Sequence, residues 1–285
     1  MPLQYLSNGF SSARSRPKLA AILYVANLAL GLIVSIPLFV AFAQATAESG
    51  YGPELAENFD LSIWADIVEQ SGPVFQSLIS QLLWILPLLF LWKVASSVGL
   101  VHALSKGGGH SFWQGIGKYT GKAFVLGLLY LVPAVVLLIG IILFAAILGG
   151  LFTGEVGSFW VQFVFTPLVL FLGFAFIDMM HDFGRMELVL GRKGIMDSWF
   201  AGMKWPLQSG AANSVYISWM MIGLVVLLFT FGIDFGMGGI FLAFVMQQLF
   251  LFARAMVTVS WIGSEVYVYE AEAPVPVSED EDTTY

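Results

Sequence analysis

Cysteine is absent from this chain of 285 residues, and charged residues are scarce. Without thiols the protein has no disulfides, thiolate zinc sites, iron–sulfur ligation or cysteine nucleophiles. Only 11% of its residues are charged, compared with about 25% in soluble domains. Hydrophobic residues make up 58% of the sequence. This composition excludes a water-soluble globular domain and indicates a protein whose main partner is the lipid bilayer.

The hydrophobic residues are gathered in six long runs. A helix needs about 20 apolar residues to cross the hydrocarbon core of a bilayer. The first run is too long for the apolar region of a cleaved signal peptide. We therefore predict an all-α fold, a polytopic membrane helix bundle with six transmembrane helices. The predicted spans are 19–43, 74–104, 123–152, 159–180, 213–233 and 238–262.

Basic residues predict how these spans are oriented. Lys93 and Arg254 lie inside spans, and the other ten of the 12 Lys and Arg residues fall on one side of the membrane. Cytoplasmic loops carry an excess of Lys and Arg, so both termini are expected in the cytoplasm of a bacterium, with the protein in its inner membrane. The predicted domains are a cytoplasmic N-terminal segment (1–18), a membrane domain (19–265) and an acidic, disordered cytoplasmic tail (266–285).

Three segments between the spans have the pattern of short amphipathic helices at the membrane interface. On the outer side, residues 61–70 place apolar side chains on one arc and acidic ones on the other. On the cytoplasmic side, residues 110–122 and 197–210 each combine adjacent aromatic residues, glycine and a lysine next to an aromatic residue. Ser111 and Gln114 have the spacing of a capping box, which predicts that a helix begins there.

Ionisable side chains inside the spans mark the candidate site. The sixth span has a polar stripe whose members lie within about 60° of one another on a helical wheel: Gln247, Arg254, Thr258, Trp261 and Glu265. A charge at membrane depth normally faces the bundle and has a partner. We therefore predict that Arg254 points into the bundle and lies within hydrogen-bonding reach of an acid or of several backbone carbonyl groups. Asp178 is the first choice of acid, then Asp182 and Glu265. Lys93 lies at a similar depth in the second span.

The fourth span ends in the densest charge cluster of the chain. Asp178, His181, Asp182 and Arg185 occupy one helical face at positions i, i+3, i+4 and i+7. Three hypotheses fit these residues: neutralisation of charges between helices, a proton or ion relay, and a catalytic or metal site. Two aspartates and a histidine could supply three ligands from one face, but the pattern matches no metal-binding motif. The most economical hypothesis is electrostatic: Asp178 or Asp182 neutralises Arg254 or Lys93 between helices, and Arg185 lies at the lipid phosphates.

In its six spans and in the charged end of the fourth span, the chain resembles a broad group of uncharacterised bacterial six-helix membrane proteins. These are distantly similar to the membrane domain found beside glycerophosphodiesterases. The resemblance rests on IDMMHDFGRMELVLG, in which Asp178 is followed seven residues later by Arg185 and then by an apolar turn. It covers most of residues 14–265. The group implies the six-helix fold, and it implies no catalytic residue.

The function predicted from the sequence is that of a non-enzymatic integral membrane protein, a structural, accessory or assembly component of the membrane. No P-loop, G-x-S-x-G or H-E-x-x-H motif occurs, and we expect no enzyme activity, cofactor, metal or nucleic-acid partner. A membrane protein or a second copy of the chain is the expected partner. The alternative is a transporter or channel with a polar path along the sixth span.

Overall fold

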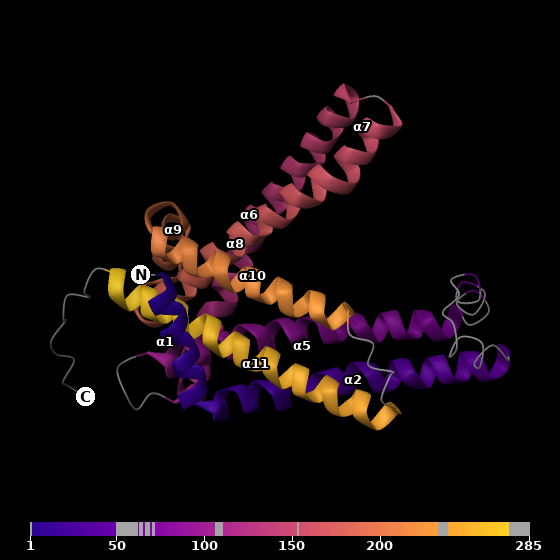
Figure 1. Ribbon diagram of the computed structural model, residues 1–285, viewed down its shortest axis with the longest axis horizontal. Helices are drawn as coiled ribbons and strands as arrows, with labels where there is room; N and C mark the ends of the chain where they lie inside the picture. The colour runs from indigo at the N-terminus through magenta and orange to yellow at the C-terminus, as the bar shows by residue number, and fades with distance from the viewer. Residues whose placement is uncertain are drawn as a thin grey trace. The chain divides into compact units, whose positions relative to one another are not determined.

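The computed structural model of the protein describes residues 2–49, 62, 65, 69, 72–105, 111–152, 154–232 and 239–273 (Figure 1). Within these residues every regular element is a helix, as the all-α prediction requires. The helices are α1 (Pro2–Ser15), α2 (Pro17–Ser49), α5 (Gly72–Leu104), α6 (Phe112–Leu151), α7 (Glu155–Phe159), the π-helical turn η1 (Trp160–Phe165), α8 (Thr166–Val189), α9 (Ile195–Gln208), α10 (Gly210–Gly232) and α11 (Gly239–Glu272).

Six helical segments are long and apolar enough to cross a membrane, which confirms the predicted number. They are Pro17–Pro37, Leu83–Leu104, Phe112–Leu151, Val156–Val189, Gly210–Leu228 and Phe244–Glu272. Their large hydrophobic side chains are widely exposed; Trp84, for example, is 83% exposed. Helices satisfy their own backbone hydrogen bonds in lipid, so the chain is a multi-pass membrane protein.

The interfacial helix predicted over 110–122 is not a separate element, and that prediction is wrong. Helix α6 runs without a break from Phe112 to Leu151, 40 residues, or about 60 Å at 1.5 Å per residue. It begins where the capping box predicts: the Ser111 hydroxyl accepts from the Gln114 N–H at 3.0 Å, and the Gln114 side chain accepts from the Ser111 N–H at 3.2 Å. The segment 112–122 is thus the first part of the continuous helix that contains the third candidate span. By contrast, most of 197–210 forms the separate helix α9.

Two further predictions concern segment ends. The tail predicted to be disordered from residue 266 is helical as far as Glu272, because Val266, Val268 and Tyr269 are buried in the core and hold α11 in place. Residues 274–285 lie outside the described residues. So does most of the predicted helix at 61–70, of which the described residues, 62, 65 and 69, are helical.

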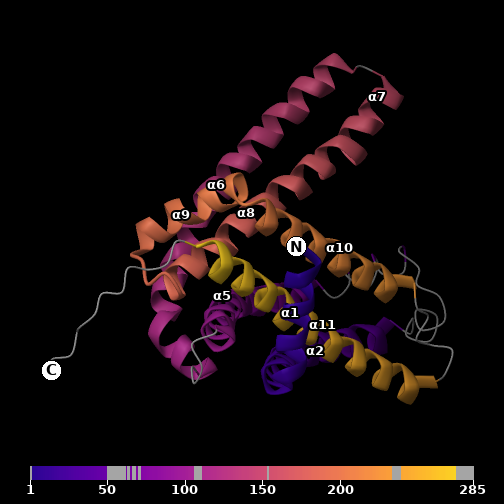
Figure 2. The ribbon, with the colours of Figure 1, turned by 60° about the vertical axis from the view of Figure 1, so that its left-hand side comes forward.

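The chain divides into two units, Ala21–Lys93 and the remainder, Met1–Ala20 with Val94–Tyr285. In the first unit, parts of α2 and α5 are joined by a hydrogen bond from Trp92 Nε1 to Asn27 Oδ1 at 3.1 Å. In the second unit α6 and α8 lie side by side, with α9 packed against α8, and α11 lies against α10 and α1 (Figures 1 and 2). Most buried side chains of this unit lie in α1, at the start of α6 and α10, and at the end of α5, α8 and α11.

Helix α1 packs on α11 through small residues. A Cβ atom built on Gly9 would lie 2.0 Å from Ser264 Oγ and 2.4 Å from the Ser260 carbonyl oxygen. Gly263 of α11 also lies close to α1, because a Cβ atom built on Gly263 would lie 3.3 Å from the Gly9 Cα atom. Since one of these obstacles is backbone, a side chain at Gly9 can be accommodated only if α1 moves away from α11.

We therefore expect Gly9→Ala to lower the free energy of unfolding by about 1–3 kcal/mol, the usual cost of overpacking a well-packed contact. The matched control is Gly121→Ala in α6, where a Cβ atom meets nothing within 4 Å. Alanine there should be neutral or stabilise the helix by up to about 1 kcal/mol. Thermal unfolding in detergent compares the two variants, and hydrogen exchange over residues 2–15 reports release of α1. Equal stability of the two variants would contradict the close packing.

Candidate functional site

The charged cluster of the fourth span lies in the last turns of α8. These turns are helical through Val189, so the predicted common face of Asp178, His181, Asp182 and Arg185 is present. Asp182 and Arg185 form an ion pair three residues apart, and each side chain is only 8% exposed. The arginine that neutralises these acids therefore comes from α8 itself, and the prediction that Arg185 lies at the lipid phosphates is wrong because Arg185 is buried.

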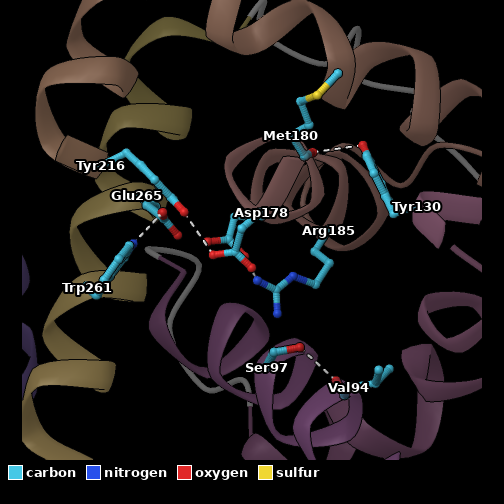
Figure 3. A network of polar contacts seen from close by, with 10 residues as sticks. Val94, Ser97, Tyr130, Asp178, Met180, Arg185, Tyr216, Trp261 and Glu265 are labelled. Carbon is cyan, nitrogen blue, oxygen red and sulfur yellow. Dashed lines mark hydrogen bonds and ion pairs between the residues drawn. The ribbon is translucent and has the colours of Figure 1, made fainter. Parts of the chain in front are cut away.

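Two neighbouring helices reach this face of α8 with hydrogen-bonding aromatic residues (Figure 3). The Tyr216 hydroxyl of α10 donates to Asp178 Oδ2 at 2.9 Å. On α11, Trp261 Nε1 donates to Glu265 Oε1 at 2.6 Å. The Tyr216 and Trp261 rings meet edge to face with centroids 5.2 Å apart. These contacts join α8, α10 and α11 through side chains that are polar at one end and apolar at the other.

Glu265 is the most deeply buried acid of the site. It is 0% exposed, and its second carboxylate oxygen, Oε2, has no hydrogen-bond partner. Figure 3 shows this oxygen turned toward Asp178 of α8. Arg185 interacts electrostatically with both Asp178 and Glu265, while its own Nε also has no hydrogen-bond partner. The site thus holds three carboxylates around one guanidinium group.

Helices α6 and α9 close the opposite side of the site. The Tyr130 hydroxyl donates to the Met180 carbonyl oxygen at 2.8 Å, and its ring lies 5.1 Å from the His181 ring, centroid to centroid. Close approach of α8 and α9 depends on two glycines: a Cβ atom on Gly202 would lie 2.7 Å from the Gly184 Cα atom and 2.4 Å from the Tyr130 hydroxyl. The end of α8 is therefore enclosed by four helices.

Sequence reasoning missed a second polar cluster, centred on Glu187. This carboxylate is 4% exposed. It accepts hydrogen bonds from Trp205 Nε1 of α9 and the Tyr269 hydroxyl of α11, each at 3.0 Å. Lys193, just beyond α8, lies 2.8 Å from Glu187 Oε2. The available signal was a glutamate two residues after Arg185 in a stretch that otherwise becomes apolar.

The predicted pairing of Arg254 with an acid is wrong. Arg254 is exposed, and within the described part of the chain its guanidinium group has no carboxylate partner. Gln247 and Thr258 on the same stripe are also exposed. Arg254 and Glu265 are eleven positions apart, or about 16 Å along the helix. The buried acids interact with Arg185 instead. Lys93 belongs to the other unit.

Comparison of the chain with protein-family models, with curated proteins and with solved structures gives no match.

Proposed function

We propose that this multi-pass membrane protein is a non-enzymatic structural, accessory or assembly component of the membrane. The observation that supports this most is the use of its charged residues: the carboxylates of Asp178 and Glu187 accept hydrogen bonds from aromatic side chains of α9, α10 and α11. Such contacts fix helices relative to one another. Charged groups are costly in a membrane, and here they form hydrogen bonds that connect the helices of the bundle.

A partner of this component is a membrane protein or a second copy of the chain. The experiment is purification in a mild detergent after cross-linking in the native membrane, followed by mass spectrometry of what remains bound. A specific protein retained at constant stoichiometry supports the proposal. Arg254→Leu is purified in the same way for comparison, because it changes an exposed charge of α11. The proposal fails if the protein is monomeric and without partners in the native membrane.

A transporter or channel is the second candidate, because Gln247, Arg254 and Thr258 form an exposed polar stripe along α11. Proteoliposomes loaded with a pH-sensitive or potassium-sensitive dye test it directly. Flux above that of empty liposomes, reduced in Arg254→Leu and Gln247→Leu, would favour transport. Flux equal to that of empty liposomes leaves the structural role as the better account.

We further propose that both termini are in the cytoplasm of a bacterium whose inner membrane holds the protein. The distribution of Lys and Arg supports this orientation, and the absence of native cysteine makes it simple to test. Cysteine introduced at Ser49 should react with an impermeant thiol reagent on intact cells, and cysteine at Ser278 only after lysis. Labelling of position 278 but not 49 on intact cells would reverse the orientation.

A further inference from the structure

Two aspartates and a histidine at the end of α8 place three potential metal-ligand atoms close together. Asp178, His181 and Asp182 each offer one ligand atom, and these atoms lie within 4.8 Å of one another. Carboxylate oxygen and imidazole nitrogen bind first-row divalent metals at about 2.0–2.2 Å, so two ligands on one ion lie up to about 4.3 Å apart. Small rotations of the side chains would bring all three onto one ion.

The candidate fourth donor is on a different helix and lies outside the group whose ligand atoms are within 4.8 Å of one another, so its side chain has to move closer for all four residues to bind one ion. Glu265 of α11 is fully buried, and its Oε2 atom has no hydrogen-bond partner while it points toward Asp178 (Figure 3). Buried polar atoms almost always have a partner. A carboxylate oxygen that lacks one and faces other carboxylates is therefore an independent sign that a positively charged ligand belongs between α8 and α11.

The balance of charge points the same way. Asp178, Asp182 and Glu265 carry three negative charges when ionised, and Arg185 supplies one positive charge. Uncompensated charge is very costly in a buried environment. A divalent cation would neutralise the excess and give Glu265 Oε2 a partner. Asp182 can still bind Arg185, because a carboxylate has two oxygens.

We propose that Asp178, His181, Asp182 and Glu265 form a binding site for a divalent metal ion between α8 and α11. Three carboxylate oxygens and one imidazole nitrogen suit Mn²⁺, Fe²⁺ or Zn²⁺ better than the soft ion Cu⁺. The hydrogen bonds from Tyr216 to Asp178 and from Trp261 to Glu265 would orient two of these carboxylates, as outer partners of metal ligands commonly do.

The test uses the full chain in detergent, without a polyhistidine tag and stripped of metal with a chelator that is then removed. In every sample the tail acids at 279–282 are replaced by their amides so that the tail cannot bind metal. Free Mn²⁺ is followed by its electron paramagnetic resonance signal as MnCl₂ is added. We expect one Mn²⁺ per chain, bound in the micromolar range or tighter.

Variants distinguish this site from adventitious binding. Asp178→Asn and Glu265→Gln should weaken Mn²⁺ binding by more than the roughly 10–100-fold that loss of an outer hydrogen-bonding partner costs, and Trp261→Phe by about that amount. Asp197→Asn, which alters an exposed acid of α9, should bind as the wild type does. Replacement of His181 by glutamine should shift the visible absorption bands of bound Co²⁺.

Folding is checked without metal, by thermal unfolding of each variant in chelator. Metal should then raise the unfolding temperature of the wild type and of Asp197→Asn, because it binds only the folded state, and not that of Asp178→Asn. The proposal is overturned if the wild type binds no Mn²⁺, Zn²⁺ or Fe²⁺ below millimolar concentration. That result is expected if Asp178 and Glu265 share a proton and bind no metal. It is equally overturned if binding survives in a folded Asp178→Asn, Glu265→Gln double variant.

Discussion

Replacement of Arg185 by leucine should lower the free energy of unfolding by about 3–5 kcal/mol, the cost of breaking a buried ion pair from one side. Arg185 is paired with Asp182, and both side chains are 8% exposed. It also interacts electrostatically with Asp178 and Glu265. The variant leaves three carboxylates together with no guanidinium group between them. Chemical unfolding in detergent, with a metal chelator present, measures the change.

Arg254→Leu is the matched control, because it makes the same substitution on an exposed residue of a membrane span. Arg254 has no carboxylate partner within the described residues, so its removal should change the free energy of unfolding by no more than about 0.5 kcal/mol. A large loss of stability in Arg254→Leu, with a small one in Arg185→Leu, would reverse the assignment and restore the pairing predicted from the sequence.

The double variant Asp182→Leu, Arg185→Leu separates the ion pair from general damage to the core. Removal of both partners of a buried pair leaves less uncompensated charge than removal of the arginine alone. The double variant should therefore be more stable than Arg185→Leu. If it is less stable by the sum of the two single effects, then Asp182 and Arg185 act independently and the pair contributes nothing.

The apolar runs were sufficient to predict the six spans, because crossing a bilayer needs a set length of apolar residues and imposes helical structure. Their ends were harder to predict. Helix α8 continues to Val189, past the predicted end at residue 180, because charged residues on its last turns are buried by neighbouring helices. Hydropathy treats such residues as the end of a span. Only tertiary contacts show that they remain inside the bundle.

The sequence predicted the arrangement of the candidate site within one helix correctly, but it predicted the wrong partner for that site on another helix. Spacing places Asp178, His181, Asp182 and Arg185 on one face, since residues three and four apart are neighbours on a helix. Which helix faces them depends on packing, for which the sequence has no local signal. Tyr216 was therefore missed, Trp261 was placed on the polar stripe without its hydrogen bond to Glu265, and Arg254 was chosen by charge alone. The glycines at 184 and 202, whose close approach brings α9 onto α8, act in the same nonlocal way.

Glu187→Ala should also be among the most damaging single substitutions, with an expected loss of about 3–5 kcal/mol. Its carboxylate accepts from Trp205 Nε1 and the Tyr269 hydroxyl at 3.0 Å each, and both donors are buried. Alanine leaves the two donors without an acceptor, which costs about 1–3 kcal/mol for each buried group, and removes packing. Lys193 adds little, because it is 41% exposed and exposed ion pairs contribute up to about 1 kcal/mol.

Asp197→Ala is the control for loss of an acid, since Asp197 is exposed on α9, and should change stability by no more than about 0.5 kcal/mol. Tyr269→Phe removes one donor to the Glu187 carboxylate and should cost about 1.5–3 kcal/mol, as hydrogen bonds to charged groups do. In the Glu187→Ala background the same change should cost much less, because its acceptor is already gone. Full additivity of the two substitutions would show that Glu187 does not join α8 to α11 through Tyr269, and the loss in Glu187→Ala would then be one of packing alone.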